Sequence, residues 1–244
     1  MDTAVQVLDT YRGRDKVIRT CGYTIQLIAG LLPKEHQAFA DALIGTASTL
    51  SGSRVVLRLC DDIPMLAYNM GYGLGGHEKD QFIRWVDVVK NMVDQFYGPV
   101  EHVMWATERQ LLPGAYTEKL KEWCTKIWAI SLTLNILRSL RALIILRLKK
   151  QRLAKSKQME ENDEADKKDD EADIKESMKT LKLQAFNVWL TLVGSSTDLV
   201  NAINWMPPGF LWAGKNPLAL TGVMGMISSS IGLYRVYASK VKQA

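Results

Sequence analysis

Several features that define common protein classes are scarce or missing in this chain. Only three of its 244 residues are cysteine (Cys21, Cys60 and Cys124), and no two of them form a CxxC pair. This pattern argues against a disulfide framework and against structural zinc. No segment alternates strictly between apolar and polar residues between hairpin turns, so no sheet is expected. The sequence therefore predicts an all-α fold.

Motifs that carry chemistry are also missing. The chain has no nucleophile–base signature, no Walker loop and no metal-ligand spacing. The glycine-rich stretch 71–76 resembles a phosphate-binding loop, but no strand pattern precedes it. Asp61 and Asp62 are adjacent and diverge on a helix, which suits helix capping better than acid–base catalysis. We predict no catalytic residue, no metal ligand and no cofactor, and hence no enzyme.

The overall composition leaves two classes open. The net charge is +5, apolar residues make up 47% of the chain, and the mean hydropathy is −0.07. A fully polytopic transporter would be more apolar than this. The first residues lack the basic and apolar regions of a secretory signal, so export by that route is not expected. The chain is either a soluble helical protein or one with a few spans joined to charged, amphipathic segments.

The longest uncharged stretch lies near the C-terminus, at residues 216–234 between Lys215 and Arg235. Its nineteen residues would form a helix about 28 Å long, close to the hydrocarbon thickness of a bilayer. One face carries a seam of small residues suited to close helix packing in lipid: Ala219, Gly222, Gly225, Ser229 and Gly232. The sequence predicts a transmembrane helix here; a glycine-rich buried helix of a soluble protein is the alternative.

Two amphipathic helices in the first quarter of the chain are candidates for contact with a membrane. In residues 16–32 and in the second helical region, 35–60, basic residues lie opposite apolar ones. The predicted membrane-inserting residues are Val17, Ile18, Cys21, Ile25 and Ile28 in the first, and Val55, Val56, Leu59 and Cys60 in the second. The predicted basic, lipid-facing residues are Lys16, Arg19, Arg54 and Arg58. Residues 16–32 either lie in a bilayer interface or cover a helix bundle, and periodicity alone favours the bundle.

Residues 78–107 form the clearest amphipathic pattern in the chain. Phe82, Trp85, Val89, Met92 and Phe96 belong to its apolar stripe, and Asp80, Asp87 and Asp94 to the opposite face.

The segment that follows is ambiguous. Residues 127–137 are uncharged, but Arg138 and Arg141 interrupt the apolar run and would be costly at the centre of a bilayer. These arginines either snorkel, if the span covers about 124–142, or line a seam that faces protein; a long interfacial helix is the alternative to a span.

A basic block and an acidic block come next. The predicted targeting residues in the basic block are Arg147, Lys149, Lys150 and Arg152. Residues 160–176 are mostly acidic and have almost nothing apolar to bury, which predicts a solvated linker. Nucleic acid is not an expected partner, because these acids would compete with phosphate and no aromatic platform is interleaved.

The resulting organisation has about two transmembrane spans, near 124–142 and 216–235. Residues 182–206 carry Asp198 on a polar face, and they lie on the membrane surface or cross it as half of a hairpin. The predicted regions are 1–122, amphipathic helices facing the cytosol; 123–147, a first membrane segment with a basic flank; 148–181, a charged linker; 182–214, an amphipathic or membrane helix with a turn; and 215–244, a transmembrane helix with a basic tail.

Short motifs in a fixed order along the chain carry a family resemblance. They include Tyr11-Arg12-Gly13-Arg14-Asp15, Leu57-Arg58-Leu59, Tyr72-Gly73-Leu74-Gly75, Glu101-His102 and Leu211-Trp212-Ala213-Gly214. In this order they resemble the peroxin-eleven family of peroxisomal membrane elongation and proliferation factors, and its gamma branch most. The acidic linker at 159–177 departs from the family pattern.

The resemblance implies a multi-pass protein of the peroxisomal membrane with both termini in the cytosol. Such a protein would insert amphipathic helices into the phospholipid membrane, and so bend and elongate it before peroxisome division. The implied protein partners are further copies of the chain, sister family members and adaptors of the fission machinery. Family behaviour points to residues 43–70 as the inserting wedge, whereas the helical pattern alone nominates 16–32. The basic block resembles a peroxisomal membrane targeting signal.

Two other functions stay open on the sequence alone. One is an oligomeric pore for small metabolites, with the face that carries Asp198 turned inward. The other is a soluble helical adaptor.

Overall fold

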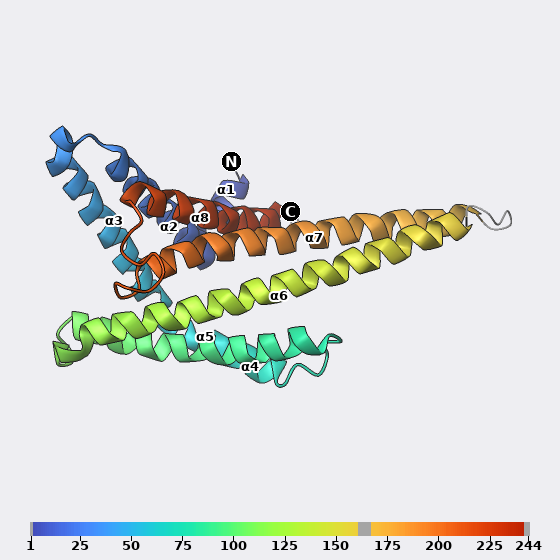
Figure 1. The fold of residues 1–244 in the computed structure, drawn as a ribbon, viewed down its shortest axis with the longest axis horizontal. Helices are drawn as coiled ribbons and strands as arrows, with labels where there is room; N and C mark the ends of the chain where they lie inside the picture. The colour runs from blue at the N-terminus through green and yellow to red at the C-terminus, as the bar shows by residue number, and fades with distance from the viewer. Residues whose placement is uncertain (1, 161–166, 242–244) are drawn as a thin grey trace.

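The fold is built from helices joined by turns, with no strand in the part of the chain that the structure describes (Figure 1). The computed structural model describes residues 2–160 and 167–241, with side chains for residues 3–155 and 174–241. In order, the elements are α1 Asp2–Leu8, α2 Tyr11–Leu31, η1 Lys34–His36, α3 Gln37–Leu57, η2 Arg58–Cys60, α4 Asp62–Tyr72, α5 Gln81–Glu108, η3 Gly114–Tyr116, α6 Thr117–Glu160, α7 Lys167–Asn204 and α8 Leu218–Val241. The predicted all-α class is confirmed.

Local sequence signals set where the helices begin and end. The Thr10 hydroxyl accepts a hydrogen bond from the backbone N–H of Gly13 and caps α2, which ends just before Pro33. The carboxylate of Asp80 caps α5 in the same way, by accepting from the N–H of Ile83. Helix α4 ends at Gly73, whose φ of 54° is a conformation that glycine adopts at little cost.

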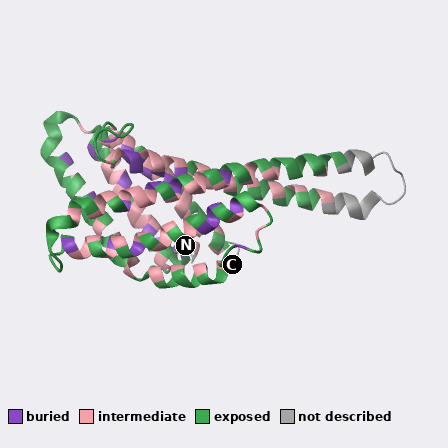
Figure 2. Cartoon of the chain, turned by 60° about the horizontal axis from the view of Figure 1, so that its bottom comes forward, coloured by how far each residue is buried: buried purple, intermediate pink, exposed green. Residues whose placement is uncertain are grey.

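The long helices pack side by side in pairs. Helix α2 lies along α8, α5 lies along α6, and α7 runs back beside α6 (Figure 1). A small apolar core of Ala129, Leu132 and Ala202 joins α6 to α7. Figure 2 shows buried residues where the helices meet and exposed residues along the protruding arm formed by α6 and α7.

The interior of this bundle is unusually polar. The largest side chains that are fully buried are Asn201, Ser139 and Ser229, whereas many large apolar side chains are exposed. A water-soluble domain normally shows the opposite distribution. The surface therefore carries apolar area that the chain itself does not cover.

Helices α6 and α7 extend far into the range that the sequence predicts as a charged linker. Helix α6 runs on to Glu160 and α7 begins at Lys167, so residues 148–160 and 167–181 are helical, and residues 161–166 lie outside the described residues. Lysine, glutamate and alanine are good helix formers even where no core covers them. Low apolar content therefore does not prevent a helix from forming here.

The seam of small residues on α8 packs against α2 of the same chain. A Cβ added at Gly222 would lie 2.6 Å from the backbone nitrogen of Leu27, and one added at Gly225 would lie 2.1 Å from the ring of Tyr23. Ser229 is fully buried. Ala219 lies against Gly30, and Gly232 lies near the stem of Lys16. The small residues of α8 thus let its backbone approach the backbone of α2 closely.

We predict that Gly222→Ala lowers the free energy of unfolding by about 1–3 kcal/mol, because the added methyl group meets the backbone of α2, which cannot move aside alone. The matched control is Gly45→Ala on α3, where an added Cβ meets nothing within 4 Å. Its better helix propensity should raise the stability by up to about 1 kcal/mol. Thermal unfolding in mild detergent measures both, and equal behaviour of the two variants would contradict the close α2–α8 packing.

Candidate membrane interface

A buried ion pair ties α2 to the C-terminal half of the chain. A guanidinium nitrogen of Arg19 donates to Asp198 at 2.6 Å and to the hydroxyl of Ser228 at 3.2 Å. Both charged side chains are almost buried, with 13% and 12% of their surface exposed. Arg19 therefore faces α7 and α8, and not the lipid side that the sequence suggests.

A second pair joins α2 to α3. Arg54 donates to Asp15 at 2.8 Å, and Lys16 lies 2.9 Å from the same carboxylate. Burial of Asp15 opposes its ionisation, but the hydrogen bond and charge of Arg54, aided by Lys16, outweigh burial and lower the pKa of the carboxyl below its ordinary value of 3.8.

Arg58 completes the set of predicted basic residues. It pairs with Glu101 of α5, and the Tyr97 hydroxyl donates to the same carboxylate at 2.8 Å. Each of the four basic residues thus has an acidic partner within the chain. The sequence pattern does not reveal this, because partners such as Asp198 and Arg19 are 179 positions apart.

Polar contacts also run along the interface of α5 and α6. Asp87 accepts from Arg138 at 2.7 Å, and Asp80 accepts from Arg141 at 2.9 Å. Further along, the hydroxyl of Ser131 donates to Asp94. The arginines that interrupt the apolar run of α6 therefore face protein, which is one of the two placements that the sequence leaves open.

One helix in the described part of the chain is long and apolar enough to cross a membrane, and it lies within residues 114–155. This range contains the predicted first span. The predicted second span, in α8, is not apolar enough by the same criterion, because its serines and glycines lower its mean hydropathy. The crossing of α8 stays a prediction.

The predicted membrane-inserting residues differ in exposure. In α2, Cys21 and Ile28 are exposed, while Val17, Ile18 and Ile25 are half-buried. Among the second group, Val56 and Cys60 are exposed, while Val55 and Leu59 are half-buried.

Exposed large apolar side chains run along the segment from α3 to α4. They are Phe39, Ile44, Val56, Leu57, Ile63, Leu66, Tyr68 and Met70. Ile63 and Met70 keep 74% and 76% of their surface exposed. The helical pattern of residues 43–57 shows only part of this surface. The rest lies on α4, where Ile63, Leu66, Tyr68 and Met70 are exposed.

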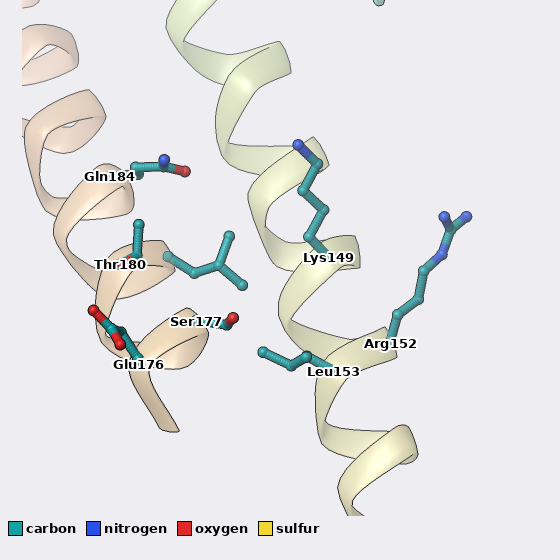
Figure 3. A pocket seen from close by; sticks show the side chains of 8 residues that line it. Lys149, Arg152, Leu153, Glu176, Ser177, Thr180 and Gln184 are labelled. Carbon is teal, nitrogen blue, oxygen red and sulfur yellow. The ribbon is translucent and has the colours of Figure 1, made fainter. Parts of the chain in front are cut away.

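The predicted targeting residues Arg147, Lys149, Lys150 and Arg152 lie exposed on the arm of α6, past its apolar run. There a cleft of about 690 Å³ separates α6 from α7. Figure 3 shows Leu153 pointing across this cleft towards α7, while Arg152 turns away from it. The role of these residues in targeting stays a prediction.

No cluster of histidine, cysteine, aspartate and glutamate that would hold a metal ion occurs among the described residues. All three cysteines are free thiols, with Cys124 buried and Cys21 and Cys60 exposed.

We predict that Asp198→Ala lowers the free energy of unfolding by about 3–5 kcal/mol, because it leaves the charge of Arg19 buried without a partner. The double variant Arg19→Met with Asp198→Leu removes both charges at similar volume and should recover most of the loss. Unfolding in mixed detergent micelles measures both. A double variant as unstable as the single one would contradict the ion-pair explanation.

The lowered pKa of Asp15 predicts a stability that depends on pH. The pair with Arg54 contributes fully above pH 3.8, and its contribution is lost as the pH falls through the lowered pKa of the folded state. The gap in thermal midpoint between the wild type and Arg54→Met should therefore shrink below about pH 4. The control is Arg14→Met. Arg14 is exposed and directly precedes Asp15 in the sequence, and its variant should show no such change with pH. A gap that stays constant down to the lowest pH would contradict the assignment.

Comparison with known proteins places the chain in a family. The family model described as "Peroxisomal biogenesis factor 11 (PEX11)" matches residues 1–237. The human protein named peroxisomal membrane protein 11C is 37% identical over 233 residues, which cover 93% of this chain and 90% of the human one. Its mouse counterpart is 35% identical over 242 residues, which cover 94% and 91%. No solved structure matches significantly. The chain therefore belongs to the peroxisomal biogenesis factor 11 (PEX11) family of peroxisomal membrane proteins.

Proposed function

We propose that this protein bends and elongates the peroxisomal membrane by inserting the segment from α3 to α4 (residues 37–72) into one leaflet, and that it thereby promotes peroxisome proliferation and division. The observation that carries the proposal is the row of exposed apolar side chains on this segment, which includes Ile63 and Met70. Family membership supplies the membrane on which it acts.

The physical mechanism is a wedge. Moving an exposed side chain such as Ile63 or Met70 from water into hydrocarbon is favourable by about 1.5–3 kcal/mol. A helix held about 5–10 Å deep expands the leaflet it enters relative to the other leaflet. Because α4 packs on α5 beside α6, and α3 packs on α2 beside α8, the wedge is anchored to the two helices proposed to span the membrane.

Between the two candidate wedges, burial supports residues 43–70 over 16–32. Helix α2 packs against both α8 and α3, and its polar side is held by Arg19. Helix α4 has no fully buried residue and packs only against α5 and η2 among the described elements with more than marginal contact. Its apolar surface is thus available for lipid.

The remaining parts of the proposal concern topology and assembly. We place both termini in the cytosol, and the adjacency of α1 to α8 supports one common side (Figures 1 and 2). The proposed protein partners are further copies of the chain, sister family members and fission-machinery adaptors. Self-association through Gly222 and Gly225 would require α2 to leave α8, because α2 occupies that seam.

A metabolite pore lined by the polar face of α7 receives no support from the described residues. Asp198, the group expected to face such a pore, is only 9% exposed and is paired with Arg19.

We predict that the full chain tubulates vesicles containing anionic phospholipid, and that Ile63→Asp combined with Met70→Asp abolishes tubulation, because two charges would have to enter the leaflet. The control is Gln110→Asp in the turn after α5, at an exposed polar position outside this segment, which should leave tubulation intact. Electron microscopy measures tubule formation, and alkaline extraction checks that each variant is still embedded. Tubulation by the double variant at wild-type level would refute the wedge.

A further inference from the structure

Helix α5 is amphipathic in the reverse sense of a helix in a water-soluble domain. Ile83, Val86 and Val88 are buried, but six large apolar residues point outwards, and each of these keeps between 44% and 69% of its surface exposed: Phe82, Trp85, Val89, Met92, Phe96 and Val103. At 3.6 residues per turn these positions lie within about 80° of one another. They form the apolar stripe of α5.

The acidic residues of α5 lie on the opposite side and point inwards. Asp87 and Glu101 are buried, and each pairs with an arginine of another element, Arg138 and Arg58. A helix that rests on a soluble core buries its apolar stripe and leaves its acids in water. Helix α5 does the reverse, which is the arrangement that lipid favours.

The contacts of α5 with α6 fix the depth of one helix relative to the other. Asp80, Asp87 and Asp94 follow one another at seven-residue steps, about 10.5 Å apart along the helix. Their partners on α6 run in the opposite direction and are Arg141, Arg138 and Ser131. The two helices therefore form an antiparallel hairpin with polar groups on its inner side.

Helix α6 contains the stretch that is able to span a membrane, and Arg138 and Arg141 lie inside it. An unpaired arginine in hydrocarbon is costly, and a carboxylate at the same depth offsets that cost. The outer side of α6 continues the apolar surface, with Ile130, Leu137, Leu140 and Ile144 all exposed. Apolar surface thus covers the outside of both helices, while their charges neutralise each other between them.

We infer that α5 enters the bilayer together with α6 and that its apolar stripe lies against the acyl chains of phospholipids. The 28 residues of α5 extend about 42 Å, enough to cross a hydrocarbon layer of about 30 Å. The turn at 109–116 then lies on one side of the membrane, and residues 73–80 lie on the other side with the basic arm of α6. With α8 crossing, both termini then share one side only if α7 crosses with it as a second hairpin. This arrangement is independent of whether the segment from α3 to α4 bends the membrane.

The first test probes what covers the apolar stripe. The full chain, with its native cysteines replaced by alanine, is labelled with a nitroxide at Met92→Cys or at the control position Gln110→Cys in the turn after α5. In vesicles of phosphatidylcholine and phosphatidylserine, the label at 92 should collide more often with oxygen than with a water-soluble nickel complex. The label at 110 should show the reverse.

Two results of this experiment would overturn the inference. A label at 92 that collides mainly with the nickel complex faces water. A label at 92 that is shielded from both reagents, and broadened by a second label nearby, faces another copy of the chain.

A second measurement tests whether α5 crosses the membrane and does not depend on the spin labels. In intact peroxisomes, a membrane-impermeant maleimide should label Lys79→Cys and Lys150→Cys to the same extent. If it labels these two, it should leave Gln110→Cys unlabelled, and if it leaves them unlabelled, it should label Gln110→Cys. Detergent should then make all three react. Equal labelling of positions 79 and 110 before detergent would mean that α5 lies on one surface, which contradicts the hairpin. If the hairpin result holds while tubulation fails, only the proposed wedge is lost.

Discussion

The fold depends on one constraint, which is that each carboxylate buried among the described residues pairs with an arginine of another element. The pairs that connect one element to another are Arg19 with Asp198, Arg54 with Asp15, Arg58 with Glu101, Arg138 with Asp87 and Arg141 with Asp80. The first of them joins two helices through residues 179 positions apart. Little apolar volume is buried: the fully buried side chains are led by Asn201, Ser139 and Ser229. Where apolar burial is small, paired polar groups fix which helices are neighbours, because any other arrangement leaves a charge unpaired.

This constraint explains how surfaces are divided between protein and lipid. Polar groups of α2 and α5 face inwards to meet their partners, so the large apolar residues of α5 are left outside. In water such an apolar surface would promote aggregation. In a peroxisomal membrane protein it is surrounded by lipid chains, which are also apolar. The segment from α3 to α4 adds a further apolar surface, and it is held to the bundle by packing against α2 and α5 and by the ion pairs of Arg54 and Arg58. An anchored but uncovered surface of this kind is what a leaflet wedge requires.

Much of the helical layout follows from local patterns. The apolar period of residues 78–107 gives α5 close to its observed limits, and the prolines near turns give the C-terminal ends of α2 and α7. The linker is the main difference, because its charged residues have high helix propensity and α6 and α7 extend through much of it. The basic residues Arg19, Arg54 and Arg58 have the spacing of a row that faces lipid. Periodicity alone does not show whether such a residue binds a lipid phosphate or an acidic side chain of the same protein, such as the partner of Arg19 179 positions along the chain.

By itself, the sequence determined that the protein is helical, because hydrophobic period and helix propensity are local properties that each segment carries alone. It also determined the small-residue seam of α8, since close approach of backbones requires residues such as Gly222 and Gly225. Only the tertiary structure decided that this seam meets α2, that Asp87 neutralises Arg138, and that the apolar stripe of α5 faces outwards. The physical reason is that an amphipathic helix has two faces, and which of them turns inwards depends on charges that other, distant helices bring to it.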